Sequence, residues 1–145
     1  MTADAEQRVR ESFGRQQAMA TIGASIDAVR AGEVTVRLPY DAGNTQQHGF
    51  VHAGMIAAIV DSACGYAALS LMPEDAAVLT VEFKLNLMAP ARGDYLLAHG
   101  RVIRPGRKLM VCLGEVFAHE GGASKQVALM TATMMVVATD TGLRD

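Results

Sequence analysis

Asp61 is the only charged residue between Gly54 and Met72, in a segment that is otherwise almost entirely apolar or small. A buried carboxylate without partners is costly, so such a group commonly serves a chemical purpose. Apolar surroundings raise a carboxyl pKa, which would make Asp61 a better base than a free aspartate while leaving it mostly ionised near neutral pH. We expect Asp61 to activate a water molecule or to attack a carbonyl itself. The structural alternative is a carboxylate held by backbone N–H groups.

Hydrogen-bond donors gather just before this segment. The backbone N–H groups of Ala53 and Gly54 would stand at the start of a helix, where they can stabilise a developing oxyanion. Gln46 offers an additional amide donor, and His52 can order the loop through a hydrogen bond. Together with a base, these donors suit attack on a carbonyl compound.

Metal and disulfide chemistry are not expected. His48 and His52 have i, i+4 spacing, but they lie in a glycine-containing loop and no third ligand follows. Cys64 and Cys112 lie in apolar surroundings without the paired spacing of a zinc site or a disulfide framework, so we predict packing roles for both. We therefore predict neither a metal nor a cofactor.

Helices and long strands must position these groups. An apolar stripe that includes Val9 and Phe13 predicts a helix over about residues 3–20, and the apolar segment predicts a central helix over about 54–72. Alternation over residues 25–39 predicts a hairpin that turns at Gly32. Four long strands are predicted after Pro73: AAVLTVEFKLNLMAP, DYLLAHGRVIR, LMVCLGEVFAH and QVALMTATMMVVAT.

Long antiparallel strands twist and curl, and a curled sheet needs something to fill its concave face. The predicted fold class is therefore α+β, with a curved antiparallel sheet of about six strands wrapped around one long central helix. A chain of 145 residues that is 50% hydrophobic can bury one sizeable core, so we predict a single domain over residues 1–145.

Charge and hydropathy exclude several partners. The segment 54–72 is long enough to be weighed as a membrane span, but Asp61 would be costly in lipid and the other segments alternate like a soluble sheet. A formal net charge of −2 gives no general basic field, so we expect no nucleic-acid partner. The N-terminus is charged and lacks the apolar core of a signal peptide, which predicts a cytoplasmic protein without membrane association.

The segments HGFVHAGMIAAIVDSACGYAA and LTVEFKLNLMAPARGD resemble the hotdog-fold acyl-CoA thioesterases of the PaaI type. The signature of that family resembles G-x-x-H-G-G, then an acidic residue on the helix, then a strand of V-x-x-x-x-N-x-x-x-P-A character. Ala53 stands at the middle position of the His-Gly-Gly triplet, and Gln46 stands where the best-known members often have Asn. The matching positions in this chain are Gly49, His52, Gly54, Asp61, Val81, Asn86, Pro90 and Ala91.

The resemblance implies an acyl-CoA thioesterase that hydrolyses a thioester to a carboxylic acid and free CoA, with Asp61 as base or nucleophile. A thiolate leaves readily, so no general acid is required. Thr80 resembles the family's Ser/Thr that orients the water, while simple strand propensity is its structural alternative. Two other functions stay open: a hotdog hydroxyacyl-thioester dehydratase or hydratase, and a non-catalytic acyl-CoA binding module.

Ala53 and Asp61 lie eight residues apart, which is about 12 Å along one helix, so both cannot contact one carbonyl. An antiparallel copy of the helix would bring its N-terminus toward this Asp61. We therefore predict a homodimer with two shared sites. The resemblance implies that such dimers often pair again as tetramers.

A basic cluster surrounds the sequence RPGRK, where proline and glycine signal a turn. We predict that the cluster contacts the phosphates of the coenzyme A substrate, whereas a solvated hairpin is the alternative. Its residues are Arg101, Arg104, Arg107 and Lys108, of which the last three are the predicted phosphate contacts.

Overall fold

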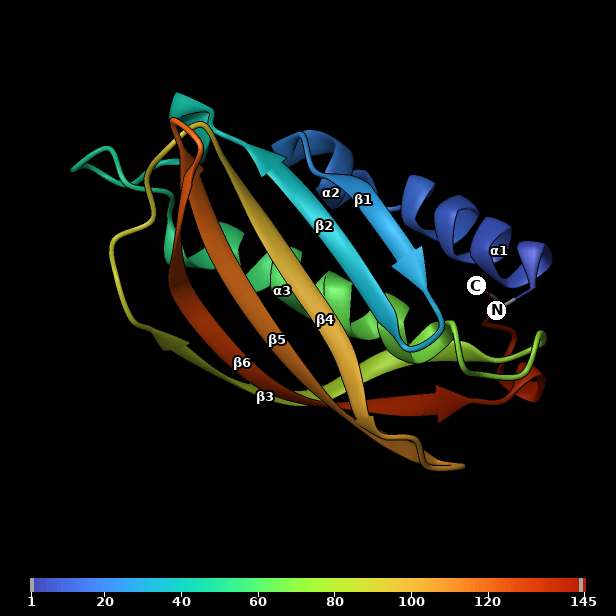
Figure 1. The fold of residues 1–145 in the computed structure, drawn as a ribbon. Coiled ribbons are helices and arrows are strands. Elements are labelled where there is room, and N and C mark those ends of the chain that lie inside the picture. Colours follow the sequence, from blue (N-terminus) through green and yellow to red (C-terminus); the bar gives the residue numbers. More distant parts are fainter. Residues whose placement is uncertain (1, 144) are drawn as a thin grey trace.

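The computed structural model describes residues 2–143 and 145 of the chain. Within these residues, one antiparallel sheet of six strands curls around a single long helix (Figure 1). The predicted α+β architecture is therefore confirmed. The strands are β1 (Ser25–Arg30), β2 (Glu33–Pro39), β3 (Ala77–Leu87), β4 (Tyr95–Arg104), β5 (Leu109–Glu120) and β6 (Ala123–Val137). The helices are α1 (Ala3–Gly14), α2 (Gln17–Ile22) and α3 (Ala53–Leu69), with short 3-10 turns η1 (Ala42–Asn44) and η2 (Thr139–Thr141).

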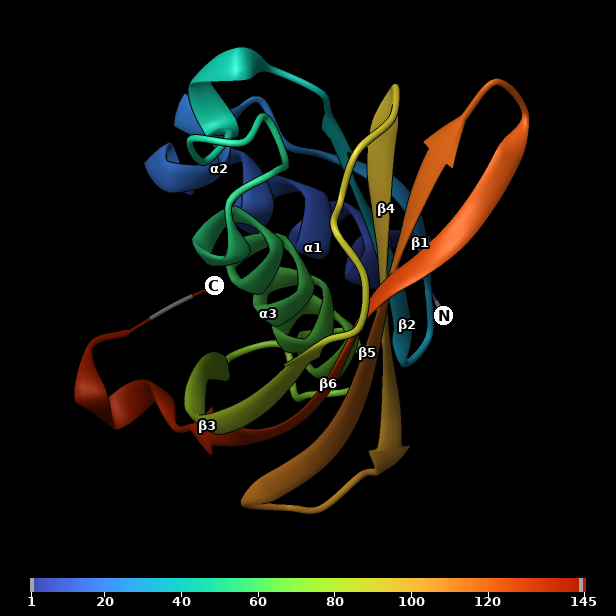
Figure 2. The ribbon, with the colours of Figure 1, turned by 90° about the vertical axis from the view of Figure 1, so that its left-hand side faces the viewer.

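The strands lie in the order β1-β2-β4-β5-β6-β3, and every neighbouring pair is antiparallel. β3 is therefore an edge strand beside β6, although β4 follows it in the sequence. The connection from β3 to β4 passes beside the loop that leads into α3 (Figure 2), where the Val51 N–H donates to the Ala91 carbonyl at 2.8 Å. This contact fixes the start of α3 against the sheet.

Two glycines seat α3 on the sheet. Gly100 in β4 and Gly114 in β5 are directly opposite each other in the strand register. A Cβ on Gly100 would lie 2.3 Å from the Ala63 carbonyl carbon, and one on Gly114 would lie 2.3 Å from Val60 Cγ2. Both distances are far inside van der Waals contact, so only glycine lets the helix lie this deep in the concave face. Asp61 lies within this seated stretch of α3.

The end of α3 differs slightly from the prediction, since the helix stops at Leu69 rather than Met72. The Ser70 hydroxyl donates to the Ala67 carbonyl at 2.7 Å and accepts from the Gly32 N–H at 2.8 Å. Ser70 thereby ends the helix and links it to the predicted β1–β2 turn, which the structure confirms at Gly32.

The predicted helix over residues 3–20 is wrong in its extent, because the chain forms two helices there. α1 ends at Gly14, and α2 ends before Gly23, which has the left-handed φ of 80°. Glycine disfavours the helix interior, so Gly14 is a natural place for the break. The break lets Val9 and Phe13 of α1 and Met19 of α2 all reach the core.

β3 is exposed along most of its length, unlike the buried strands at the centre of the sheet. Val81, Phe83 and Leu87 are respectively 53%, 44% and 52% exposed. An edge strand with apolar side chains and free backbone groups is a surface suited to pairing with another chain. Across residues 2–143 and 145, no helix combines the length and apolar character needed to cross a membrane.

Candidate active site

Asp61 and Thr80 meet between α3 and β3. The Thr80 hydroxyl donates a hydrogen bond of 2.8 Å to Asp61 Oδ1. Thr80 is exposed but lies on the helix-facing side of β3, where its strand partner is Met134, a buried residue whose sulfur lies 3.4 Å from the same hydroxyl. The register of β3 then shifts between Thr80 and Glu82, which marks a bulge directly after the site. The structure therefore brings together Asp61, which was predicted as base or nucleophile, and Thr80, which the resemblance implies as the residue that orients the water.

The surroundings of Asp61 favour a base of increased strength. Burial raises the pKa of the Asp61 carboxyl above its ordinary value, and the hydrogen bond from Thr80 opposes part of that rise. Asp61 remains only partly buried, so a small molecule can approach it. Nearby Cys64 and Cys112 are free and buried, and burial raises the pKa of both thiols, which is consistent with the predicted packing roles.

His52 caps the start of α3. Its Nδ1 accepts the Gly54 N–H at 2.9 Å, and its own backbone N–H donates to the Asn44 carbonyl at 2.9 Å. His52 therefore orders the loop as predicted. The structure differs from the prediction at Gly54, because that N–H already has an acceptor in His52. The Ala53 N–H has no acceptor within the described residues, and it is the donor that remains available at the helix start.

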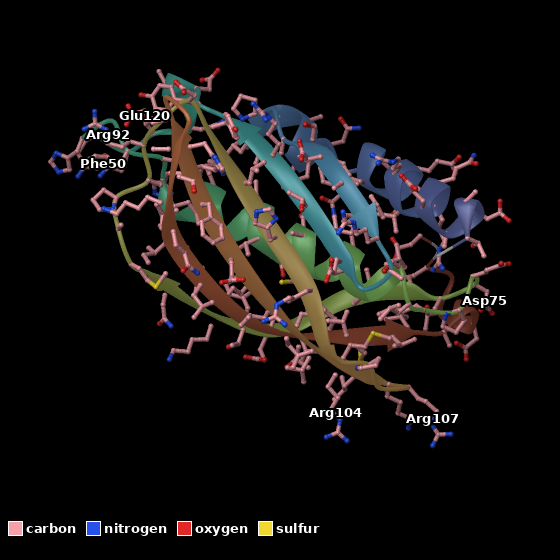
Figure 3. The ribbon with its side chains drawn as sticks, in the orientation of Figure 1. Phe50, Asp75, Arg92, Arg104, Arg107 and Glu120 are labelled. Atoms are coloured by element: carbon pink, nitrogen blue, oxygen red, sulfur yellow. The ribbon has the colours of Figure 1, made fainter. Side chains whose placement is uncertain are left out.

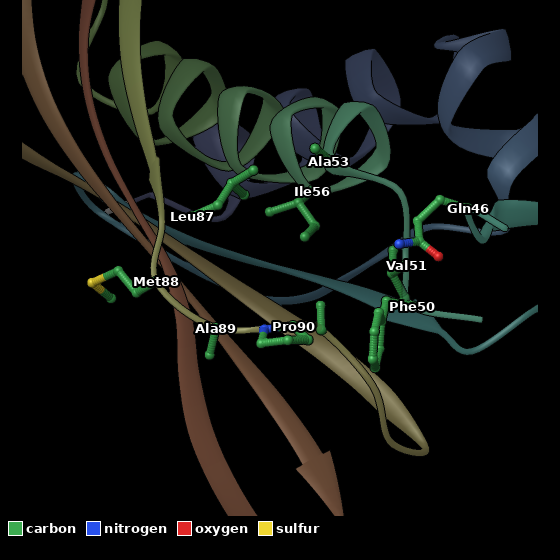
Figure 4. A pocket seen from close by; sticks show the side chains of 10 residues that line it. Gln46, Phe50, Val51, Ala53, Ile56, Leu87, Met88, Ala89 and Pro90 are labelled. Carbon is green, nitrogen blue, oxygen red and sulfur yellow. The ribbon is translucent and has the colours of Figure 1, made fainter. Parts of the chain in front are cut away.

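Gln46 points its amide nitrogen toward a pocket beside the start of α3. The Oε1 atom of Gln46 accepts the backbone N–H of His48, which fixes the orientation of the amide group. The Nε2 donor then faces the interior of a pocket, as Figure 4 shows. Gln46 and Ala53 thus supply two donors on one wall of that pocket.

The pocket has a volume of about 380 Å³ and lies between the start of α3 and the end of β3 (Figure 4). Its walls are mostly apolar, which suits an apolar ligand chain. Sequence reasoning missed most of this lining; the one available signal was Phe50, an aromatic residue in an otherwise polar and glycine-containing loop. The lining residues are Gln46, Phe50, Val51, Ala53, Ile56, Leu87, Met88, Ala89, Pro90 and Ala91.

The candidate groups therefore form two separate half-sites on one chain. Gln46 and Ala53 line the pocket, whereas Asp61 and Thr80 do not. Ala53 is the first residue of α3 and Asp61 lies eight residues further, about 12 Å along the axis. The structure thus places Ala53 and Asp61 on one continuous helix, as the sequence predicted.

The basic cluster lies in the turn between β4 and β5. Arg104, Arg107 and Lys108 are exposed, and Figure 3 shows Arg104 and Arg107 projecting from the sheet end opposite Phe50. Strand register places this turn at the same end as Thr80, because Met110 pairs with Met134 and Met134 pairs with Thr80. The turn therefore lies at the end of the sheet that carries Thr80. Among the described residues, no three His, Cys, Asp or Glu side chains lie close enough to hold a metal ion.

Comparisons with known proteins identify the family and the fold of this chain. Residues 48–125 match the sequence profile of the thioesterase superfamily. The crystal structure of a thioesterase family protein from Silicibacter pomeroyi is similar over 92% of this chain and 98% of that one, with 50% identity and a TM-score of 0.91. The Escherichia coli PaaI protein from the phenylacetic acid degradation operon shares the fold at 21% identity, over 92% of this chain and 94% of that one, with a TM-score of 0.82.

A curated relative from Halobacterium salinarum, a candidate esterase, is 36% identical over 90 residues. That alignment covers 59% of this chain and 59% of the relative, so the chain spans less than two thirds of the length of this relative.

Proposed function

The chain belongs to the thioesterase superfamily, with the hotdog fold of PaaI-type members, and we propose that it hydrolyses acyl-CoA thioesters to a carboxylic acid and free CoA. The observation that carries the proposal is the Asp61–Thr80 pair. A carboxyl whose pKa is raised by burial is held by one hydroxyl at the edge of an apolar sheet face. Such a group is suited to take a proton from water or to attack a carbonyl itself.

In the general-base form of the mechanism, Asp61 accepts a proton from a water molecule as the water oxygen attacks the thioester carbon. The negative charge that develops on the carbonyl oxygen is stabilised by the Ala53 N–H and by Gln46 Nε2. Collapse of this intermediate breaks the C–S bond and expels CoA thiolate, which accepts the proton from Asp61. In the alternative form, Asp61 attacks the carbon, the C–S bond breaks and CoA leaves as a thiolate. Water then hydrolyses the resulting mixed anhydride, which releases the carboxylic acid, regenerates the Asp61 carboxylate and supplies the proton that the thiolate accepts.

We propose that the site is shared between two subunits. The donors and the base are about 12 Å apart on one α3, so the reacting carbonyl needs the donors of one chain and the base of another. The exposed edge of β3 supports this arrangement, because it offers free backbone groups and apolar side chains beside Asp61 and Thr80. In the dimer, the subunit that supplies Asp61 also supplies the basic turn of Arg104, Arg107 and Lys108. This turn contacts phosphates of coenzyme A.

A second pairing of dimers into a tetramer is supported by the outer face of the sheet. Leu79, Met135 and Leu109 lie side by side in register on that face and are all exposed. An apolar patch on the solvent side of a sheet is suited to burial against another copy.

Release of free thiol from a panel of acyl-CoAs tests the proposed reaction. The enzyme should release CoA together with the carboxylic acid, and Asp61→Asn should abolish most of that release. A change in absorbance without thiol would identify a dehydratase or hydratase instead. Binding of acyl-CoA without either change would identify a binding module.

A further inference from the structure

One arginine joins α1 to the turn between α3 and β3 (Figure 1). Arg8 Nη1 donates to the Pro73 carbonyl at 2.8 Å and to the Met72 carbonyl at 3.4 Å. Its Nη2 donates to the Ala76 carbonyl. The forked guanidinium therefore closes the whole turn, which ends immediately before β3 begins at Ala77.

The Arg8 guanidinium is half-buried and lies among carboxylates. Burial lowers the pKa of Arg8 from its ordinary value, and the charges of Asp145, Glu74 and Asp75 oppose this change. Hydrogen bonds from a charged donor are stronger than those between neutral groups. The contacts of Arg8 therefore hold the turn firmly against α1.

A second link leads from α1 to β3 through Asp145. The Ser12 hydroxyl donates to Asp145 Oδ1 at 3.0 Å, and the Val78 N–H donates to Asp145 Oδ2 at 2.6 Å. Since the Ser12 hydrogen is used in this way, the Tyr66 hydroxyl is the donor to Ser12 Oγ, at 3.2 Å. Ser12 and Tyr66 are both buried. A chain of hydrogen bonds thus runs from α3 through α1 to β3.

These two links hold the elements that carry the candidate base and its partner. Val78 lies two residues before Thr80 in β3, and Tyr66 lies five residues after Asp61 in α3. β3 is the edge of the sheet, so strand pairing holds it on one side only. A small movement of β3 relative to α3 would lengthen the hydrogen bond of 2.8 Å between Thr80 and Asp61.

We propose that α1 positions the Asp61–Thr80 pair, with Arg8 and Ser12 as its two positioning residues. This inference rests on the proposed function, which gives that pair its role in the reaction. Each positioning residue acts by fixing β3 relative to α3, so that the Thr80 hydroxyl stays at hydrogen-bond distance from Asp61. Loss of either link should weaken that bond.

A weaker bond from Thr80 has a measurable consequence at Asp61. Burial raises the pKa of Asp61 and the bond from Thr80 lowers it, so loosening this bond should raise the pKa further. The charge of Asp61 also acts on Cys64, but burial raises the pKa of that thiol and keeps it neutral. Thr80 is therefore the group through which α1 reaches the base.

The pH profile of kcat/KM tests both residues. Arg8→Ala and Ser12→Ala should each move the acid limb to higher pH and lower kcat/KM on that limb about threefold, the scale of a weakened hydrogen bond. Ser12→Ala changes no charge, and it keeps the test decisive if Arg8→Ala does not fold. Arg10→Ala is the matched control, because Arg10 is exposed in α1 and pairs with Glu6 at 2.8 Å. An unmoved acid limb in Ser12→Ala and in any folded Arg8→Ala would overturn the proposal.

Combination with Thr80→Val distinguishes positioning from a general loosening of the fold. Thr80→Val already removes the bond to Asp61, so adding Ser12→Ala or Arg8→Ala should move the acid limb no further. An equal additional shift in the Thr80→Val background would also overturn the proposal, because α1 would then act by a route that does not include Thr80.

Carbon-13 NMR titration of the Asp61 carboxyl separates this inference from the proposed reaction, because it needs no turnover. The pKa of Asp61 should be higher in Ser12→Ala and Arg8→Ala than in the wild type, and unchanged in Arg10→Ala. If the wild type hydrolyses no acyl-CoA yet Asp61 titrates in this way, the proposed reaction fails and positioning by α1 stands. If the wild type is active but neither the titration nor the acid limb moves, positioning by α1 fails alone.

Discussion

The hydroxyl of Thr80 in β3 donates a hydrogen bond of 2.8 Å to Oδ1 of Asp61 in α3. This contact joins the central helix to the exposed edge strand of the sheet, at the point where the register of β3 shifts. Since Oδ2 of Asp61 has no hydrogen-bond partner within the described residues, one oxygen is held and the other stays available for a substrate or water. The pair has the arrangement expected for a positioned base.

Asp61→Asn should reduce kcat for acyl-CoA hydrolysis by about 100-fold or more, the scale of a lost general base or nucleophile. Asn keeps the size of Asp61 and can still accept from Thr80, so the affinity for acyl-CoA should change little. Steady-state kinetics with calorimetric binding check both statements. Asp27→Asn, an exposed carboxylate in β1, is the control. Near-wild-type turnover in Asp61→Asn would exclude the assigned role.

The same substitution should not weaken the fold. Burial raises the pKa of Asp61 in the folded state, so the ionised carboxylate is disfavoured there relative to the unfolded chain. Its contribution to stability therefore falls as the pH rises from the unfolded pKa through the folded one. Above that range Asp61→Asn should be at least as stable as the wild type in urea unfolding, so lost activity cannot be ascribed to unfolding.

Thr80→Val should shift the acid limb of the kcat/KM profile to higher pH. The hydrogen bond from Thr80 lowers the pKa of Asp61, so its removal should raise that pKa further and require a higher pH to ionise the base. Thr133→Val is the matched control, because the Thr133 hydroxyl donates to Glu82 at 2.6 Å on the same pair of strands but away from Asp61. An unmoved acid limb in Thr80→Val would show that this bond does not tune the base.

Replacing Arg107 and Lys108 together with Ala should raise KM for acyl-CoA more than KM for acyl-pantetheine, which lacks the nucleotide phosphates. The difference should shrink at high ionic strength, because these side chains are exposed. Equal effects on the two substrates would mean that the β4–β5 turn is a solvated hairpin.

Gly100→Ala should destabilise the protein by about 1–3 kcal/mol, the usual cost of forcing atoms into a packed core. The added Cβ would lie 2.3 Å from the Ala63 carbonyl carbon and would lift α3 from the sheet. Gly65→Ala, in α3 itself, is the control, since its Cβ would meet nothing within 4 Å. Alanine is also more favourable than glycine in a helix by about 1 kcal/mol. Chemical denaturation of both variants checks the sign of each effect. Equal stability would contradict the role assigned to Gly100.

The sequence carried enough information to predict the fold and to select residues that the structure places close together, Asp61 and Thr80. Asp61 was recognisable because one charge in an apolar helix is unusual, and Thr80 became a candidate through its resemblance to the family's Ser/Thr that orients the water. Other features depend on tertiary geometry that no local pattern encodes. The capture of the Gly54 N–H by His52 is one example, and the orientation of Gln46 by the His48 N–H is another. The pocket beside Phe50 likewise arises only where segments distant in the sequence meet.

In the proposed dimer, one reacting carbonyl uses the donors of one chain and Asp61 of another. Ala53→Pro removes the Ala53 N–H, and proline is well tolerated at the first position of a helix. His52 already has the extended backbone, with φ −61° and ψ 139°, that precedes proline, so the fold should survive. Ala53→Pro and Asp61→Asn should each be nearly inactive alone.

Unfolding and refolding the two variants as an equal mixture measures the sharing directly. Random pairing makes half of the dimers mixed, and each mixed dimer contains one intact site and one doubly defective site. Activity should therefore return to about a quarter of the wild-type value. Native mass spectrometry verifies that the subunits have exchanged. A verified mixture that is no more active than its parents would contradict the shared site and place all catalytic groups within one chain.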